Sequence, residues 1–457
     1  MRGCAMDRRR LSIGLVLEIS VVAFEALSVA TIAPKVAREL GGIELYGWTF
    51  AAFMLANLVS VVLAGHASDR HGPAAPFTVG LVLFVAGLIA CGAAPSMPVL
   101  IVGRVVQGLG AGTIGATAFV AIGRAFDEHE RARQFALLST AWVVPGLLAP
   151  AVAGIIADEV GWRLVFFGLI PLPLIAAWLT LPALRSLGSG VQMTEGVLPV
   201  GAAAQLALGA GLMVAGLGAD EAYVAAPLAA IGIAVSIPAF MHLTPPGTLR
   251  ARRGLPAAVA ARGLQTFAFF GADAFLALAL ASVRDLSPVG VGVVLTPATL
   301  TWTAGSWIQA HRAGVWTRRS MATVGLALVA VGVVLMAAVL LEDVPVEAIA
   351  AVWGIAGLGM GLSYSTMSIS VLSEVDAASQ GAATAALQLS DVLGQALGTG
   401  LGGAIVAVAA SGQGARKDAL AIVFALMLFV AVFGTLAARR LPNDPAGLRA
   451  STVRSGS

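Results

Sequence analysis

Charged residues are scarce in this sequence. Asp, Glu, Lys and Arg make up only 11% of its 457 residues, less than half the share found in an average soluble domain, whereas 58% of the residues are hydrophobic. Aromatic residues are also few, at 6%, but there are 54 glycines, which allow membrane helices to pack closely. The composition therefore predicts an integral membrane protein rather than a soluble domain.

Several kinds of chemistry are also missing. The two cysteines, Cys4 and Cys91, are far apart, and no His/Cys cluster has the spacing of a metal site. No Gly-rich phosphate loop ending in Lys-Ser/Thr is present, so we expect that ATP does not drive this protein directly. Basic residues are scattered over loops, which argues against a nucleic-acid partner. We expect no enzymatic activity, no cofactor and no metal.

Apolar windows of about 20 residues, long enough to span a bilayer, recur along the whole chain. We predict fourteen membrane helices, at residues 11–33, 47–64, 76–94, 98–123, 134–156, 163–183, 197–218, 223–242, 256–283, 287–310, 319–341, 345–372, 378–410 and 418–438. An even number places both termini on one side. That side holds 20 of the 27 Lys and Arg residues, the opposite loops hold six, and Arg104 lies in the membrane. The positive-inside rule then predicts that both termini are cytoplasmic.

Arg104 is a permanently charged side chain within a glycine-rich apolar stretch. A lone charge in hydrocarbon costs several kcal/mol, so we expect a carboxylate to lie beside it. The acidic residues within long apolar stretches are few: Glu18, Glu25, Asp273 and Asp391. A membrane arginine facing scarce membrane acids is typical of a proton- or ion-coupled carrier.

The two halves of the chain repeat one another. Gly108-x-Gly110-x-Gly112 has a counterpart in Gly357-x-Gly359-x-Gly361, and the Gly146, Pro150, Gly154 spacing has one in Gly394, Gly398, Gly402. The segment from Gly65 to Gly72 has a weaker copy from Gly305 to Gly314. Related halves with a site between them are a transporter architecture, and the seventh and eighth helices read as an inserted pair.

These motifs resemble those of the major facilitator superfamily. Gly65-x-x-x-Asp69-Arg70-x-Gly72 looks like its signature loop, and Arg104-x-x-Gln107-Gly108-x-Gly110 looks like its fourth-helix motif. The extra central pair and Gly161-Trp162-Arg163 resemble the fourteen-helix drug:H+ antiporter branch. In the helix-5 motif, Ala149-Pro150 stands where the family usually has Gly-Pro.

The resemblance implies an all-α major facilitator fold with two six-helix bundles and two inserted helices. We place the first bundle at residues 1–183, the inserted pair and its linker at 184–250, the second bundle at 251–441 and a cytoplasmic tail at 442–457. The signature loop would act as a latch, with Asp69 accepting hydrogen bonds at the start of helix 13 near Ser379 to Ala382 and Arg70 bracing the contact. Alternatively, the segment from Gly65 to Gly72 is an ordinary cytoplasmic turn.

In the family, helices 1, 4, 9 and 12 would line the cavity, so Glu25 and Arg104 would face each other there. Glu25 is then a coupling or binding residue, or a purely structural partner of the arginine. Glu18, two helical turns earlier, is a second coupling candidate, or a side chain that extends toward water.

Further candidates lie in the second half. Asp273 sits among phenylalanines and is hard to explain as packing, whereas Asp391 either couples protons or belongs to an interhelical hydrogen-bond network. Trp142, Trp353 and Tyr364 could line a cavity or anchor helix ends at the membrane interface. The glycine-rich helices 5, 10 and 13 are predicted to be packing seams.

The sequence thus predicts a secondary active transporter of the cell (inner or plasma) membrane. We expect it to export amphipathic or lipophilic compounds against proton influx, as a monomer. A dedicated exporter of a lipid or natural product would use the same residues. An uptake carrier is less favoured, and a non-transporting scaffold would have neutral residues where this chain has Arg104 and the membrane acids.

Overall fold

The computed structural model describes residues 8–126, 130, 134, 137, 141–187, 200–219, 221–312, 315–375, 380–408 and 413–444, and every regular element in them is helical. Helices satisfy their own backbone hydrogen bonds, which a chain in hydrocarbon must do. Twelve helical segments among these residues are long and apolar enough to cross a membrane. With the 17-residue α6 and the more polar α12, the described residues contain the fourteen membrane helices that the hydropathy pattern predicts.

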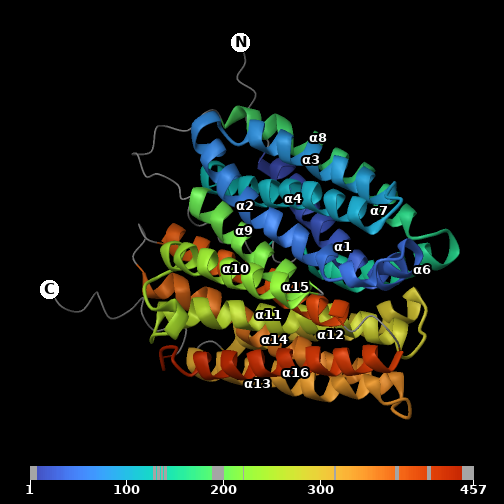
Figure 1. The fold of residues 1–457 in the computed structure, drawn as a ribbon. Helices are drawn as coiled ribbons and strands as arrows, with labels where there is room; N and C mark the ends of the chain where they lie inside the picture. Colours follow the sequence, from blue (N-terminus) through green and yellow to red (C-terminus); the bar gives the residue numbers. More distant parts are fainter. Residues whose placement is uncertain are drawn as a thin grey trace. The chain divides into compact units, whose positions relative to one another are not determined.

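The chain divides into two compact units. Unit 1 comprises Met1–Ala207 and Ser287–Gly292, and unit 2 comprises Leu208–Leu286 and Val293–Ser457. The described helices that lie wholly in unit 1 are α1 (Arg8–Leu40), α2 (Trp48–His71), α3 (Ala74–Gly92), α4 (Met97–Ala125), α6 (Val143–Glu159), α7 (Arg163–Leu169) and α8 (Pro171–Ser186) (Figure 1). Pro171 starts α8 directly after α7, and the two together make the sixth span.

Unit 2 has the same kind of helical construction. Its described helices are α10 (Ala222–Leu243), α11 (Leu255–Ser282), most of α12 (Pro288–Arg312), α13 (Arg318–Met336), α14 (Val346–Glu374), α15 (Gln380–Val408) and α16 (Gln413–Ala438), and α9 (Val200–Leu217) is divided between the units at Ala207. Short 3-10 turns lie at Ile43–Leu45, Thr248–Arg250 and Ala337–Leu340.

Two helices continue well past their predicted C-terminal ends. α1 continues to Leu40 although Pro34 lies inside it. Proline removes a single backbone donor, and a long helix can tolerate that loss when its neighbours hold it. α2 continues to His71, so the segment from Gly65 is helical rather than a loop. Hydropathy detects only the apolar part of each helix.

The repeated glycines of α4 pack in an alternating pattern. A Cβ on Gly108 would lie 2.2 Å from the carbonyl oxygen of Phe53 in α2, and one on Gly110 would lie 2.3 Å from the amide nitrogen of Phe84 in α3. Both distances are to backbone atoms, so any larger residue would force the helices apart. The glycines are therefore required where three helices of unit 1 meet.

The counterpart glycines in unit 2 pack in the same way. A Cβ on Gly357 would lie 2.0 Å from the carbonyl oxygen of Ala298 in α12, and one on Gly359 would lie 2.3 Å from the carbonyl oxygen of Gly325 in α13. α14 thus packs between α12 and α13 as α4 packs between α2 and α3. The repeated glycines of the sequence thus occupy equivalent packing positions in the two units.

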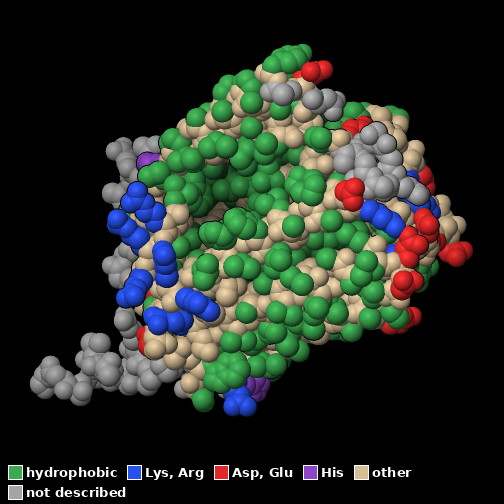
Figure 2. Space-filling model, turned by 60° about the horizontal axis from the view of Figure 1, so that its bottom comes forward, with side chains coloured by type: hydrophobic (Ala, Val, Ile, Leu, Met, Phe, Trp, Pro, Cys, Tyr) green, Lys and Arg blue, Asp and Glu red, His purple; other side chains and the backbone are tan. Residues whose placement is uncertain are grey.

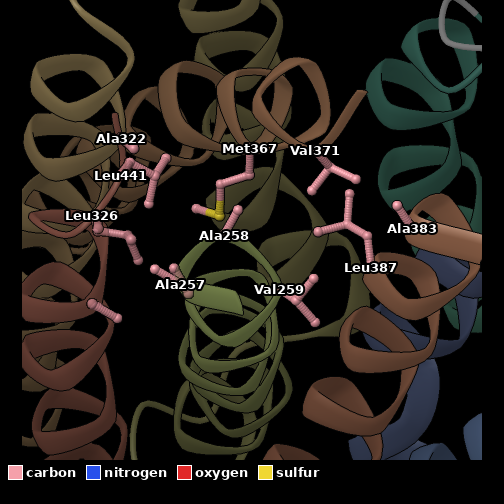
Figure 3. Packing of buried hydrophobic residues seen from close by; sticks show 13 residues of the cluster. Ala257, Ala258, Val259, Ala322, Leu326, Met367, Val371, Ala383, Leu387 and Leu441 are labelled. Atoms are coloured by element: carbon pink, nitrogen blue, oxygen red, sulfur yellow. The ribbon is translucent and has the colours of Figure 1, made fainter. Parts of the chain in front are cut away.

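The core of unit 2 is built from small and aliphatic side chains around the start of α11. Figure 3 shows Met367 of α14 pointing toward Ala258 of α11, with Leu387 of α15 on the other side of Val259. The small residues of α11 bring its backbone close to the surrounding helices. This packing surrounds the part of α11 that carries Arg262 and Gln265.

Candidate functional site

Arg104 of α4 is buried in unit 1 and has several hydrogen-bond partners. Its Nη1 donates to Oε1 of Glu25 in α1 in a very short contact, and its Nε donates to the carbonyl oxygen of Thr49 at 2.9 Å. The guanidinium also lies over the ring of Phe53, 4.3 Å from the ring centroid. The side chains of Arg104 and Glu25 are 2% and 0% exposed, so the ion pair is removed from water. The structure therefore supplies the carboxylate that a membrane arginine requires.

One side of this ion pair is left open. Nη1 of Arg104 also donates to Oε1 of Gln107 at 2.6 Å, but neither Oε2 of Glu25 nor Nε2 of Gln107 has a hydrogen-bond partner among the described residues. A buried carboxylate oxygen without a donor costs free energy unless something binds it. Glu25 can therefore accept a proton or a cation without first losing another hydrogen bond.

Glu18 lies two turns earlier on α1 and is completely buried. Neither of its carboxylate oxygens has a partner among the described residues. This placement differs from the alternative in which the side chain extends to water. An unpaired carboxyl in such surroundings is stable when it is protonated, because the neutral acid avoids the desolvation cost of the charge.

Unit 2 contains a second buried ion pair, between Arg262 of α11 and Asp391 of α15. Nη1 of Arg262 lies 3.5 Å from Oδ2 of Asp391, and the same oxygen accepts the hydroxyl of Tyr364 at 2.6 Å. The other oxygen of Asp391 accepts Nε2 of Gln395 at 3.3 Å. Nη2 of Arg262 donates to Oγ of Ser368 at 2.8 Å. Asp391 therefore takes part in an interhelical hydrogen-bond network, which is one of the two roles considered for it from the sequence.

The sequence reading missed Arg262 and assigned its charge to the cytoplasmic side. It lies in the second turn of α11 with 2% of its surface exposed, and its guanidinium stacks on the Tyr364 ring at 3.4 Å. The side predicted to be cytoplasmic therefore holds nineteen Lys and Arg residues instead of 20, and Arg104 and Arg262 both lie within membrane helices. The signal was available, because Arg262 falls inside the predicted span 256–283 with Asp391 as a possible partner.

Asp273 lies three turns beyond Arg262 on the same helix. Its Oδ1 accepts the indole N–H of Trp353 at 3.0 Å, and Trp353 is fully buried in α14. Between these two groups, Gln265 donates to Oγ of Ser363 at 2.7 Å. Residues 262, 265, 269 and 273 share one face of α11, and the three polar ones each contact α14.

Aromatic rings connect Asp273 and Asp391 in unit 2. Phe269 stacks on Trp353 with ring centroids 5.0 Å apart and packs edge-on against Trp302, which in turn lies 5.4 Å from Tyr364. The indole of Trp353 reaches Asp273 at one end, and the hydroxyl of Tyr364 reaches Asp391 at the other. Trp302 and Tyr364 are the partly exposed members of this aromatic cluster, whereas Trp353 is buried.

Other candidates lie apart from these clusters. Trp142 is 45% exposed and lies directly before α6. Gly72 ends α2 with a positive φ of 78°, which explains a glycine there. No described atom lies within 4 Å of a Cβ on Gly65, and Arg70 is exposed. The side chain of Asp69 and its expected contact near Ser379 lie outside the described residues.

The helix-5 motif makes a close backbone contact within unit 1. A Cβ on Gly154 would lie 2.8 Å from the Cα of Val289, and one on Gly292 would lie 2.5 Å from the carbonyl oxygen of Pro150. Gly146 is buried one turn before Pro150. These positions are packing contacts, in keeping with a seam of small residues.

The Gly161-Trp162-Arg163 motif has a structural role in unit 1. The indole N–H of Trp162 donates to Oε2 of Glu39 at 2.8 Å, and Arg163 donates to the carbonyl oxygen of Ala94 at 3.1 Å. Both residues line an open pocket of about 560 Å³ together with Lys35 and Asp158. The motif thus joins the ends of α1, α3 and α7.

The sequence of this chain is similar to those of known transporters. The family model of the Major Facilitator Superfamily matches residues 15–339. A probable multidrug-efflux transporter of Mycobacterium tuberculosis is 26% identical over 461 residues, which cover 95% of this chain and 97% of the relative. The multidrug transporter protein MdtP of Bacillus subtilis is 30% identical over 174 residues, which cover 38% of this chain and 32% of that protein.

A solved structure agrees with the fold. A peptide transporter in complex with alafosfalin matches with a TM-score of 0.69 and 17% sequence identity, covering 94% of both chains. The family match covers most of the chain and includes the Arg104 motif, and the described residues contain the fourteen membrane helices that the resemblance implies. This chain is a membrane transporter protein that belongs to the Major Facilitator Superfamily.

Proposed function

We propose that this chain is a proton-coupled secondary transporter that exports amphipathic or lipophilic compounds across the cell membrane. The observation that carries the proposal is the buried Glu25–Arg104 ion pair, with one carboxylate oxygen free of any described donor. Two relatives are named for multidrug efflux or transport, which supports export of such compounds.

The coupling step follows from the contacts of Glu25. While Arg104 stays beside it, the carboxylate is paired with the opposite charge of the guanidinium. When the arginine moves away, or when the free oxygen takes up a proton, the ion pair weakens and the guanidinium turns to its other partners, the Thr49 carbonyl and Gln107. Proton binding at Glu25 thereby changes how α1 is held against α4.

The aromatic cluster of unit 2 supplies a place for the substrate. The partly exposed Trp302 and Tyr364 would stack on flat apolar parts of a compound, and Asp273 would attract a positive group on it. An amphipathic molecule carries both features. A neutral lipid or natural product would use the rings alone, so a dedicated exporter remains the second candidate.

The test is proton-driven movement of a cationic dye in inverted membrane vesicles or proteoliposomes. Wild type should transport the dye when a proton gradient is applied and stop when a protonophore collapses it. Glu25→Gln should reduce this transport to the level of empty vesicles, because glutamine cannot release a proton. Exchange of labelled dye for unlabelled dye without a gradient should persist in the variant, which separates coupling from misfolding.

The matched control is Glu347→Gln, which removes an exposed carboxylate at the start of α14. It should transport like wild type. Dye transport that continues after the proton gradient is collapsed would rule out proton coupling. A wild type that moves no cationic dye, yet exports a lipid or natural product in a proton-dependent way, would favour the dedicated exporter.

A further inference from the structure

The connection between α10 and α11, residues 244–254, is a folded loop. Three of its residues have positive φ: Gly247 at 93°, Ala251 at 43° and Gly254 at 87°. The left-handed conformation costs a non-glycine residue such as Ala251 about 1–2 kcal/mol, so the loop must compensate for it. The amide nitrogens of Arg250 and Arg252 both donate to the carbonyl oxygen of Gly247 at 3.1 Å.

The end of α16 holds this loop in place. Nη1 of Arg440 donates to the carbonyl oxygens of Arg250, at 2.6 Å, and of Ala251, at 3.2 Å. In return, the amide nitrogen of Gly254 donates to the carbonyl oxygen of Arg440 at 3.2 Å. The strained turn at Ala251 thus aims two successive carbonyl groups at one guanidinium. The contacts fix the direction of the residues on either side.

Three arginines of the loop, and Arg439 directly after α16, are exposed. Arg250, Arg252, Arg253 and Arg439 are all exposed, and no carboxylate of a described residue forms an ion pair with any of them. The stem of Arg252 lies across Gly247, where a Cβ would come within 2.4 Å of it. Of the two acidic residues nearest this end, Asp444 pairs with Arg318, and Glu374 lies beside Gly254.

Apolar side chains accompany these arginines. Leu249 is 56% exposed directly before Arg250, and Met241 is 60% exposed in the last turn of α10. In Figure 2, Lys and Arg side chains gather along one edge of the visible face, next to a broad hydrophobic area. A surface that passes from apolar side chains to guanidinium groups matches the boundary between acyl chains and phosphates.

We propose that the α10–α11 connection, together with Arg439, binds the phosphate groups of anionic phospholipids in the adjoining leaflet. Guanidinium groups suit this ligand because their N–H pairs contact phosphate oxygens in a two-pronged fashion. Leu249 inserts among the acyl chains at the same place. The proposal does not depend on the identity of the transported compound.

The experiment measures lipid retention by the purified full-length protein with native mass spectrometry. Phosphatidylglycerol and phosphatidylcholine of equal chain length are offered to wild type and to Arg252→Gln/Arg253→Gln. Wild type should prefer the anionic lipid, and the variant should bind it about 25-fold less tightly, on the scale of about fivefold for each arginine at a membrane surface. Arg252→Lys/Arg253→Lys should lose only part of the preference for phosphatidylglycerol. Lysine keeps the positive charge but lacks the paired N–H groups with which a guanidinium contacts a phosphate.

The control is Arg312→Gln, which removes an exposed arginine at the end of α12, outside the loop. It should bind phosphatidylglycerol like wild type. An equal loss in Arg312→Gln, or full retention in Arg252→Gln/Arg253→Gln, would overturn the proposal. In a further arm, inorganic phosphate at the same concentration should not displace the lipid; displacement would identify a simple anion site instead. Equal thermal unfolding of all variants shows that they fold.

Discussion

At the scale of single residues, the buried ion pairs are where a substitution should affect stability most. Each unit contains a buried ion pair within its helices, and the arginine of each pair is also bound to a backbone carbonyl oxygen: Arg104 to that of Thr49, and Arg262 to that of Tyr364. A buried pair adds little net stability, because desolvation offsets the attraction. Losing one partner is costly, however, since the remaining charge has no water to solvate it.

We therefore predict that Arg262→Met and Asp391→Leu, made singly, each destabilise the protein by about 3–5 kcal/mol. The double variant Arg262→Met/Asp391→Leu should lose clearly less than the sum, because it leaves no charge unpaired. Thermal unfolding in detergent of the four proteins measures this. Additive losses would show that the two side chains do not depend on each other.

At the scale of elements, the glycines of α4 and α14 determine how closely the helices pack. Gly108→Ala and Gly357→Ala place a methyl group about 2 Å from a backbone carbonyl oxygen, which no rotamer change can relieve. Overpacking of this kind costs about 1–3 kcal/mol. We expect both variants to unfold at lower temperature than wild type in the same detergent.

Gly115→Ala is the matched control for these changes. It lies on α4 with no described atom within 4 Å of its added Cβ. Alanine is the better helix former by about 0.5–1 kcal/mol, so this variant should be as stable as wild type or slightly more stable. If Gly115→Ala were as damaging as Gly108→Ala, close helix packing would not be the cause.

At the scale of the whole molecule, an even number of membrane helices predicts that both termini lie on the same side. The side that carries the termini also carries nineteen of the 27 Lys and Arg residues, so we predict that it is cytoplasmic. A green fluorescent protein fused to the C-terminus should fluoresce, and alkaline phosphatase fused there should be inactive. Alkaline phosphatase fused after residue 343, in the loop between α13 and α14, should be active. The reverse pattern would show the opposite orientation.

Much of the fold could be predicted because its signals are local. Apolar stretches and the repeated glycines are visible in one sequence, and both led to the fourteen-helix architecture. The errors were at helix ends, as at Leu40 and His71, where polar residues continue a helix that hydropathy no longer detects. Arg262 was missed for another reason: it lies inside the predicted span 256–283, but its charge was counted with the cytoplasmic residues instead of being matched with Asp391.

The sequence by itself determined which residues lie in the membrane and that the membrane charges would need partners, because hydrophobicity and charge belong to each residue. The family resemblance already paired Glu25 with Arg104, and the structure contains that contact; the other partners were decided only by the tertiary structure. Glu25 rather than Glu18 lies beside Arg104, 79 residues away along the chain. Asp391 lies beside Arg262, and Asp273 lies beside Trp353. These pairs depend on the rotation and spacing of helices, which the packing of distant small residues sets.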